Sequence, residues 1–134
     1  MKYWILPSNN KLFKMEAALR ANNGIIDWQT GKMQVGDIVF MYKTLPDGCI
    51  KYMMEVVKTG FTRQEALDQR AFWVNKLQLD SSNGIYSRLK LIETLDGSKL
   101  TLQALRMHGV NGKIQGKRTC PEETLAFIMQ TIGK

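Results

Sequence analysis

Aromatic side chains placed among polar and basic residues are the first candidates for chemistry in this sequence. They are Trp4, Trp28, Tyr42, Tyr52 and Trp73. A ring of this kind stacks on a nucleic-acid base with a contribution of about 1–3 kcal/mol and requires little of the surrounding sequence. Trp4 lies in an apolar run, which favours the core. For Trp28, beside Asp27, two roles are equally consistent with the sequence: a ring that binds a ligand, or a ring that covers the core.

Short polar side chains follow the first apolar run of the chain. Ser8, Asn9 and Asn10 come directly after it. Their hydroxyl and amide groups are able to hydrogen-bond the edge of a base at the mouth of a pocket. The same residue types favour the N-cap of a helix, and the sequence leaves both interpretations open.

A basic loop containing two glycines is predicted near the C-terminal end, where residues 112–118 read GKIQGKR and His108 lies just upstream. The glycines let a ligand approach the backbone closely, and Gln115 offers an amide donor and acceptor. Lys113, Lys117 and Arg118 form a patch suited to phosphate. A plain tight turn explains the glycines as well. The net charge of +7 agrees with a polyanionic partner, although charge alone also serves solubility.

The usual signatures of catalysis and metal binding are absent. The single histidine cannot build a multi-histidine metal site, and Cys49 and Cys120 lie far apart without CxxC spacing, so we expect two reduced thiols, no metal and no cofactor. No GxGxxG, Walker or GxSxG motif occurs. The carboxylates show no paired spacing; they include Asp27, Asp37, Asp47, Glu55 and Glu93. We therefore expect no enzyme.

The pattern of apolar residues and turn formers predicts an α+β domain. We expect strands over 2–6, 37–43, 50–58 and 86–95, with the second and third of these joined as a hairpin by LPDG, and Pro7 and Gly60 ending the first and third. One helix is expected from Leu12, with its apolar face over 12–19, to its stop at 22–24, and others from Thr101 and from Pro121. In the last helix, Leu125, Ile128, Met129 and Ile132 share one apolar face. Residues 25–29 are predicted to be irregular, and 62–79 is consistent with helix and strand alike. Four to six strands and three helices do not alternate as βαβ units.

Length and hydropathy indicate one soluble domain. The 134 residues are 44% apolar, enough for one core, so we assign residues 1–134 to a single domain. No apolar run approaches the roughly 20 residues that span a bilayer, and the N-terminus does not resemble a signal peptide. We expect a cytoplasmic protein with no membrane partner.

Several segments together resemble one known family. They are YWILPSNNKLF, IIDWQTGKMQVGDIVFMYKTLPDGCIKYMMEVVKTG, YSRLKLIETL and LTLQALRMHGVNGKIQGKRT. In order and spacing they are similar to the EVE domain of the PUA-like superfamily, over nearly the whole chain. This resemblance implies a small β-barrel or a strongly curved mixed sheet with helices packed around it. It also implies a relation in fold to the YTH readers of methylated adenine in RNA, and some EVE domains are fused to nucleases that act on modified cytosine in DNA.

The resemblance also implies a pocket that receives a flipped base. Carried over by position, its residues are Trp4, Ser8, Asn9, Trp28, Tyr42, Lys43, Ile114, Gln115 and Gly116. Lys113, Lys117 and Arg118 would then meet phosphate. The family usually has a proline where this chain has Lys117, which adds a positive charge and changes the expected turn. We expect no fused nuclease, so that any step after recognition would be carried out by another protein.

The favoured hypothesis is a non-catalytic module that recognises a modified base in DNA or RNA. Three alternatives stay open. The same pocket would suit a free modified nucleoside or another metabolite, or hydrolysis or deamination using Asp27. A protein-interaction module would expose Met33, Met53 and Met54, which more often fill a core.

Overall fold

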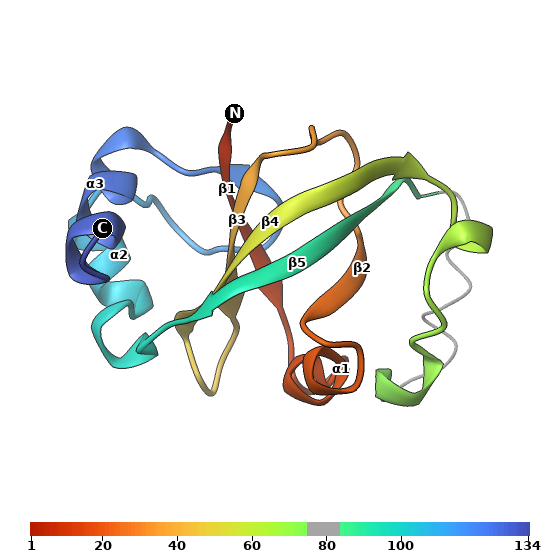
Figure 1. Cartoon of the computed structure of the whole chain (residues 1–134). Coiled ribbons are helices and arrows are strands. Elements are labelled where there is room, and N and C mark those ends of the chain that lie inside the picture. Colours follow the sequence, from red (N-terminus) through yellow and green to blue (C-terminus); the bar gives the residue numbers. More distant parts are fainter. Residues whose placement is uncertain (75–83) are drawn as a thin grey trace.

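The computed structural model describes residues 1–74 and 84–134, whose strands form one six-stranded sheet (Figure 1). The strands are β1 (Tyr3–Ser8), β2 (Ile25–Gln29), β3 (Ile38–Lys43), β4 (Cys49–Phe61), β5 (Tyr86–Thr94) and β6 (Arg118–Thr119). The α-helices in these residues are α1 (Met15–Ala21), α2 (Leu102–Met107) and α3 (Glu122–Thr131). Short 3-10 turns lie at η1 (Arg63–Glu65), η2 (Arg70–Phe72) and η4 (Gly97–Lys99). The α+β prediction is confirmed.

The sheet is mixed and open. Its strand order is β2-β5-β4-β3-β1-β6, in which β1 and β3 run parallel and the other pairs are antiparallel. Of the two predicted forms, the strongly curved sheet is therefore the one observed, and the closed barrel is not.

Register irregularities curve the sheet. The pairing of β4 with β5 shifts three times, and each such bulge bends and twists the strand that carries it. The curvature brings together loops that extend from opposite edges of the sheet. The Lys117 Nζ, just before β6, donates to the Lys32 carbonyl oxygen, just after β2, at 3.1 Å.

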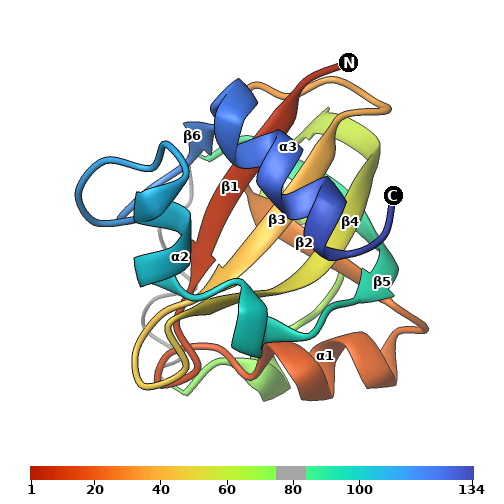
Figure 2. The ribbon, with the colours of Figure 1, turned by 90° about the vertical axis from the view of Figure 1, so that its left-hand side faces the viewer.

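One face of the sheet carries a core under α2 and α3. In Figure 2, α3 lies across β1 and β3, and α2 lies beside β1. Alternate residues of the central strands supply it, among them Ile5, Phe40 and Tyr42. The expected helix face of Leu125, Ile128, Met129 and Ile132 packs here. We call this cluster the α2–α3 core.

The other face carries a second core, which includes Leu6, Val39 and Met41 from the strands and Ala18 from α1. Met33, Met53 and Met54 are all buried in one of the two cores, so their predicted role as core filler is confirmed and the idea of an exposed methionine surface is wrong. Trp4, Trp28, Phe72 and Trp73 lie partly buried at the border of this second cluster. We call it the α1 core.

The expected hairpin and the later helices form where the sequence placed them. The hairpin strands are β3 and β4. Thr101 is the N-cap of α2, and its Oγ1 accepts from the Ala104 N–H at 3.2 Å. Pro121 precedes α3 as its N-cap.

Some local expectations are wrong. Residues 25–29 form a strand because β5 pairs with all five of them. Pro7 does not end β1. Because β6 pairs only with Trp4 and Ile5, no strand on that side of β1 requires a hydrogen bond from the N–H that Pro7 lacks. β4 continues past Gly60 to Phe61. The first helix begins at Met15, later than expected, and Lys14 is its N-cap, so Ser8–Asn10 do not cap it.

The ambiguous segment 62–79 is described only in part. Residues 62–74 contain η1 and η2, and Trp73 forms an isolated bridge with Phe13; residues 75–79 lie outside the described part. No helix within residues 1–74 and 84–134 is long and apolar enough to cross a bilayer.

Candidate functional site

A cleft of about 580 Å³ lies between the end of β2 and the segment that carries η1 and η2. Figure 1 shows that segment, in green, beyond β2 and away from α2 and α3. Side chains from β2, β5 and residues 63–73 line it: Asp27, Trp28, Gln29, Gly31, Arg63, Ala66, Leu67, Asp68, Gln69, Arg70, Trp73 and Tyr86. We call this hollow the tryptophan cleft.

Two nearly parallel indole rings form one wall of the tryptophan cleft. The centroids of Trp28 and Trp73 are 5.8 Å apart, with an interplanar angle of 14°. Phe13, fully buried, meets both rings edge-on at 4.9 and 4.8 Å. Because a buried ring supports both indoles from behind, their orientation is fixed before any ligand arrives.

Backbone hydrogen bonds hold Trp73 in place. The Lys14 N–H donates to the Phe72 carbonyl oxygen and the Val74 N–H to that of Leu12, both at 2.8 Å. These bonds attach the segment carrying Trp73 to the loop that precedes α1. Sequence reasoning noted Trp73 as an aromatic candidate but left it out of the pocket, because FWV fits a strand and a helix alike and shows no partner.

Asp27, at the inner end of the cleft, is committed to structure. Its carboxylate accepts from Arg88 Nε at 2.8 Å and Nη2 at 3.0 Å, and from the Leu67 backbone N–H at 2.7 Å. The Asp27 side chain is fully buried. The hydrogen bond to Asp27 raises the pKa of Arg88, which keeps the guanidinium protonated. Asp27 therefore fastens residue 67 to the sheet.

Gln69 fastens the same segment through the backbone of β2. Its Nε2 donates to the Asp27 carbonyl oxygen and its Oε1 accepts from the Asp27 N–H, both at 2.8 Å. β2 is an edge strand, and an edge presents unpaired backbone groups. The buried Gln69 amide satisfies one pair of them as a neighbouring strand would.

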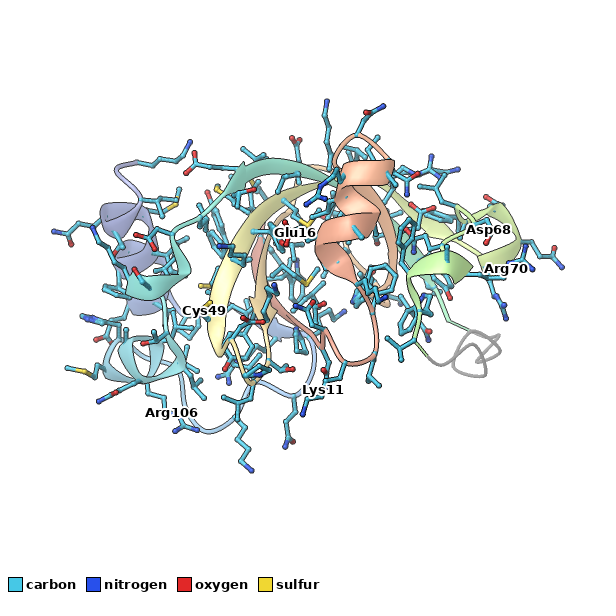
Figure 3. All side chains as sticks on the ribbon, turned by 90° about the horizontal axis from the view of Figure 1, so that it is seen from below. Lys11, Glu16, Cys49, Asp68, Arg70 and Arg106 are labelled. Carbon is cyan, nitrogen blue, oxygen red and sulfur yellow. The ribbon has the colours of Figure 1, made fainter. Side chains whose placement is uncertain are left out.

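The mouth of the cleft carries a neutralised pair of charges. Arg70 donates to Asp68 through Nε at 2.9 Å and Nη2 at 2.8 Å, and these hydrogen bonds lower the pKa of Asp68 to about 2. Figure 3 labels both residues on the side of α1 opposite to Cys49 and Arg106. Arg63 also lines the cleft. The polar rim thus contains two arginines and one paired carboxylate.

Trp4 lies outside the cleft lining, partly buried near β6. Its Nε1 donates to Asp37 Oδ2 at 2.9 Å, and the Lys117 Nζ lies 4.9 Å from its ring centroid. Asp37 also accepts from the Lys2 and Gln34 backbone N–H groups. Burial alone would raise the pKa of Asp37, but the hydrogen bonds from these three donors together lower it.

The residues after β1 and at the end of β3 also lie away from the cleft lining. Ser8 is buried, and its Oγ has no hydrogen-bond partner among the described residues. The Asn9 Oδ1 accepts from the Lys11 N–H in a local turn. Tyr42 packs in the α2–α3 core, and the buried Lys43 approaches Asp47 at 3.6 Å.

The loop before β6 contributes side chains of different kinds. Ile114 is buried in the α2–α3 core, whereas Gln115, Gly116 and Lys113 are exposed. Arg118 Nη1 donates to the Asn111 carbonyl oxygen at 3.0 Å. Of the predicted pocket residues, Trp28 lines the tryptophan cleft. A binding role for the remaining residues stays a prediction.

The described residues contain no group of three or more histidine, cysteine, aspartate or glutamate side chains arranged to hold a metal ion. Cys120 is buried, which raises the pKa of its thiol to about 11, and burial raises the pKa of Cys49 as well. Both thiols are free. What remains for ligand recognition in the cleft is aromatic surface with a charged rim.

Comparison with known proteins gives a family and a fold. A sequence profile of the EVE domain matches residues 2–129, and no curated protein matches the chain significantly. ASCH from Zymomonas mobilis is similar in structure at 9% identity, with a TM-score of 0.68, over 96% of this chain and 94% of that chain. A hypothetical protein from Leishmania major is similar in structure at 18% identity, with a TM-score of 0.65, over 99% of this chain and 95% of that chain. The DUF55 domain of human thymocyte nuclear protein 1 is similar at 13% identity, with a TM-score of 0.59, over 96% of each chain.

Proposed function

The chain belongs to the EVE domain family, and on that premise we propose that it is a non-catalytic module that binds nucleic acid and takes one base into the tryptophan cleft. The fixed, nearly parallel rings of Trp28 and Trp73 carry this proposal. A base stacked on such rings gains about 1–3 kcal/mol. Because Phe13 already holds the rings, the protein orders little on binding, which favours affinity.

We further propose that the base is a modified one, extruded from its strand. Extrusion costs a few kcal/mol, which stacking and hydrogen bonds to the base edge must offset. The cleft offers both kinds of contact, since aromatic rings form its wall and Gln29, Tyr86 and arginines add polar groups. A methyl group on the base adds apolar surface where these rings line the cleft, and each buried CH₂ contributes about 0.8 kcal/mol.

The engagement of the acidic groups supports binding without turnover. A general base needs a carboxylate free to reach the proton that it takes. Asp27 is bound by Arg88 and by the Leu67 N–H, and Asp68 by Arg70. The hydrolytic alternative built on Asp27 would require breaking a buried ion pair in each cycle, so we favour the module that only binds.

The test is fluorescence anisotropy with matched labelled oligonucleotides. Single- and double-stranded DNA and RNA would be compared with and without methylated cytosine, hydroxymethylated cytosine and methylated adenine. We expect tighter binding to one modified strand, a loss of at least tenfold in Trp28→Ala, and partial retention in Trp28→Phe, which keeps an aromatic face. Circular dichroism would confirm that both variants remain folded. Equal affinity of wild type and folded Trp28→Ala would refute a base in this cleft.

One observation favours a second ligand class. The volume of about 580 Å³ lies within the roughly 300–1,000 Å³ typical of small-molecule sites. A free modified nucleoside would bind with little dependence on salt, whereas a strand releases counterions and its binding weakens steeply. Calorimetric titration with the nucleoside, beside the strand titration at two salt concentrations, separates the two ligands.

A further inference from the structure

Two lysine ammonium groups meet the ring of Trp4. The Lys117 Nζ lies 4.9 Å and the Lys2 Nζ 5.6 Å from the ring centroid. Lys117 also donates to the Lys32 carbonyl oxygen at 3.1 Å. Both side chains lie at the surface, and the exposed Lys32 adds a third positive charge to the same turn. We call Lys2, Lys117 and the Trp4 ring the lysine clamp.

Within the described residues, no carboxylate oxygen lies within 4 Å of an ammonium group of the lysine clamp. Within residues 1–74 and 84–134, none of the ion pairs involves Lys2, Lys32 or Lys117. Asp37 lies at the ring edge, where its buried carboxylate accepts three N–H groups and makes no ion pair with a described lysine. A weakly paired cluster of ammonium groups beside an aromatic face attracts an anion.

The lysine clamp and the tryptophan cleft share one turn. Gly31 lines the cleft, and a Cβ placed on Gly31 would lie 3.4 Å from the Lys117 Nζ. One residue therefore borders both sites. The curvature of the sheet produces this neighbourhood, because it brings the loops beyond β2 and before β6 together.

We propose that the lysine clamp binds a phosphate group of the ligand whose base enters the tryptophan cleft. The proposal rests on the proposed function, because it places the phosphate on the far side of Gly31 from the base. Phosphate binding is thereby assigned to Lys2 and Lys117 and not to the other basic residues of the chain. Two sources share this chemistry, a phosphodiester of a strand and the terminal phosphate of a free nucleotide.

The test compares salt dependence in two double variants that lose the same charge. Lys2→Ala/Lys117→Ala removes both clamp ammonium groups. Lys90→Ala/Lys99→Ala removes two exposed lysines from β5 and η4, neither of which lies within 4 Å of a carboxylate among the described residues. The probe is a fluorescein-labelled 12-nucleotide single strand, titrated between 50 and 500 mM NaCl.

Loss of the clamp should flatten the slope of log K against log salt by about 0.7 for each phosphate that is no longer neutralised, and weaken binding about tenfold per phosphate at 50 mM NaCl. The control variant should keep a slope closer to wild type. Equal slopes for the two double variants would overturn the proposal, because the effect would then follow net charge alone. So would a wild-type protein that binds neither the strand nor adenosine 5′-monophosphate at 50 mM NaCl.

Further arms identify the phosphate source and separate the two proposals. If adenosine 5′-monophosphate binds more tightly than adenosine, and only with the clamp intact, a terminal phosphate is sufficient. If Lys2→Ala/Lys117→Ala weakens binding of the strand but not of adenosine 5′-monophosphate, the clamp binds a phosphodiester. Trp28→Ala should reduce affinity at every salt concentration and leave the slope unchanged. If Trp28→Ala weakens binding but Lys2→Ala/Lys117→Ala leaves the salt slope unchanged, the clamp is refuted and the base site stands. If the double variant flattens the slope but Trp28→Ala leaves the affinity unchanged, the base site is refuted and the clamp stands.

Discussion

At the scale of single residues, the buried ion pair of Asp27 and Arg88 is the strongest polar attachment at the cleft. Both of its hydrogen bonds are short, and the Asp27 carboxylate is withdrawn from solvent. Removing one partner of a buried pair leaves the other charge uncompensated. Asp27, which also accepts from the Leu67 N–H, is therefore one of the residues that hold residues 63–73 beside β2.

Asp27→Asn is expected to reduce the free energy of unfolding by about 3–5 kcal/mol, because Arg88 loses its anionic partner. Urea denaturation followed by tryptophan fluorescence measures it. Asp68→Asn is the matched control, since its pair with Arg70 is exposed and should leave the urea midpoint unchanged. Comparable losses in both variants would show that burial does not distinguish the two pairs.

Asp37 links the stability of the fold to pH. Its pKa is lower in the folded protein than the ordinary value of about 3.9, so its contribution is fully present above that value and is lost as the pH falls through the folded pKa. Asp37→Asn should destabilise the protein at pH 7 by about 1–3 kcal/mol and make the loss of stability below pH 4 shallower. Urea midpoints at pH 7, 4 and 3 for both proteins test this. Parallel pH profiles would contradict it.

At the scale of elements, the edge of β2 is covered by a side chain rather than by a strand. Gln69 satisfies the backbone of Asp27 in both directions. Without it, the edge strand would present those groups to solvent or to another chain, and the segment with η1 and η2 would be attached mainly through Asp27 and Trp73.

Gln69→Leu, which keeps bulk but removes the amide, should lower the free energy of unfolding by about 1–3 kcal/mol, because a buried N–H and a buried carbonyl lose their partners. Hydrogen exchange should accelerate at the Asp27 amide. The Ile26 amide, within the ladder with β5, is the internal control. Unchanged exchange at Asp27 would show that the Gln69 amide does not protect this edge.

At the scale of the whole molecule, the two cores share the same strands. Neighbouring residues of β1 and β3 point alternately into the α2–α3 core and the α1 core, so neither core can form without the sheet. We therefore predict one cooperative unfolding transition. Tryptophan fluorescence reports the α1 core side, where Trp4, Trp28 and Trp73 lie, whereas far-ultraviolet circular dichroism reports all helices.

Leu105→Ala places a cavity in the α2–α3 core, where Leu105 is fully buried, and should cost about 2–5 kcal/mol. Both probes should shift to the same lower midpoint, although the tryptophans lie on the other face of the sheet. A shift seen by circular dichroism alone would reveal two independently unfolding units.

Strong local signals in the sequence are sufficient to predict several elements. Two strand-like apolar segments and the LPDG turn predict the β3–β4 hairpin. Thr101 and Pro121 mark the starts of α2 and α3, and the periodic apolar face of α3 predicts its packing. These features depend on neighbours in the chain, so turn chemistry, capping and periodicity are sufficient to identify them. The resemblance carried by longer segments indicated the curved sheet.

The set of residues that forms the cleft could not be predicted, because long-range contacts bring them together. β2 exists because β5 pairs with it, Trp73 joins Trp28 because its backbone pairs with the loop before α1, and Asp27 is occupied because Arg88 lies opposite it across the sheet. These contacts join residues as many as 61 positions apart, as between Asp27 and Arg88. No local pattern encodes such partners, because side chains distant in sequence become neighbours only once the strands and loops that carry them have paired.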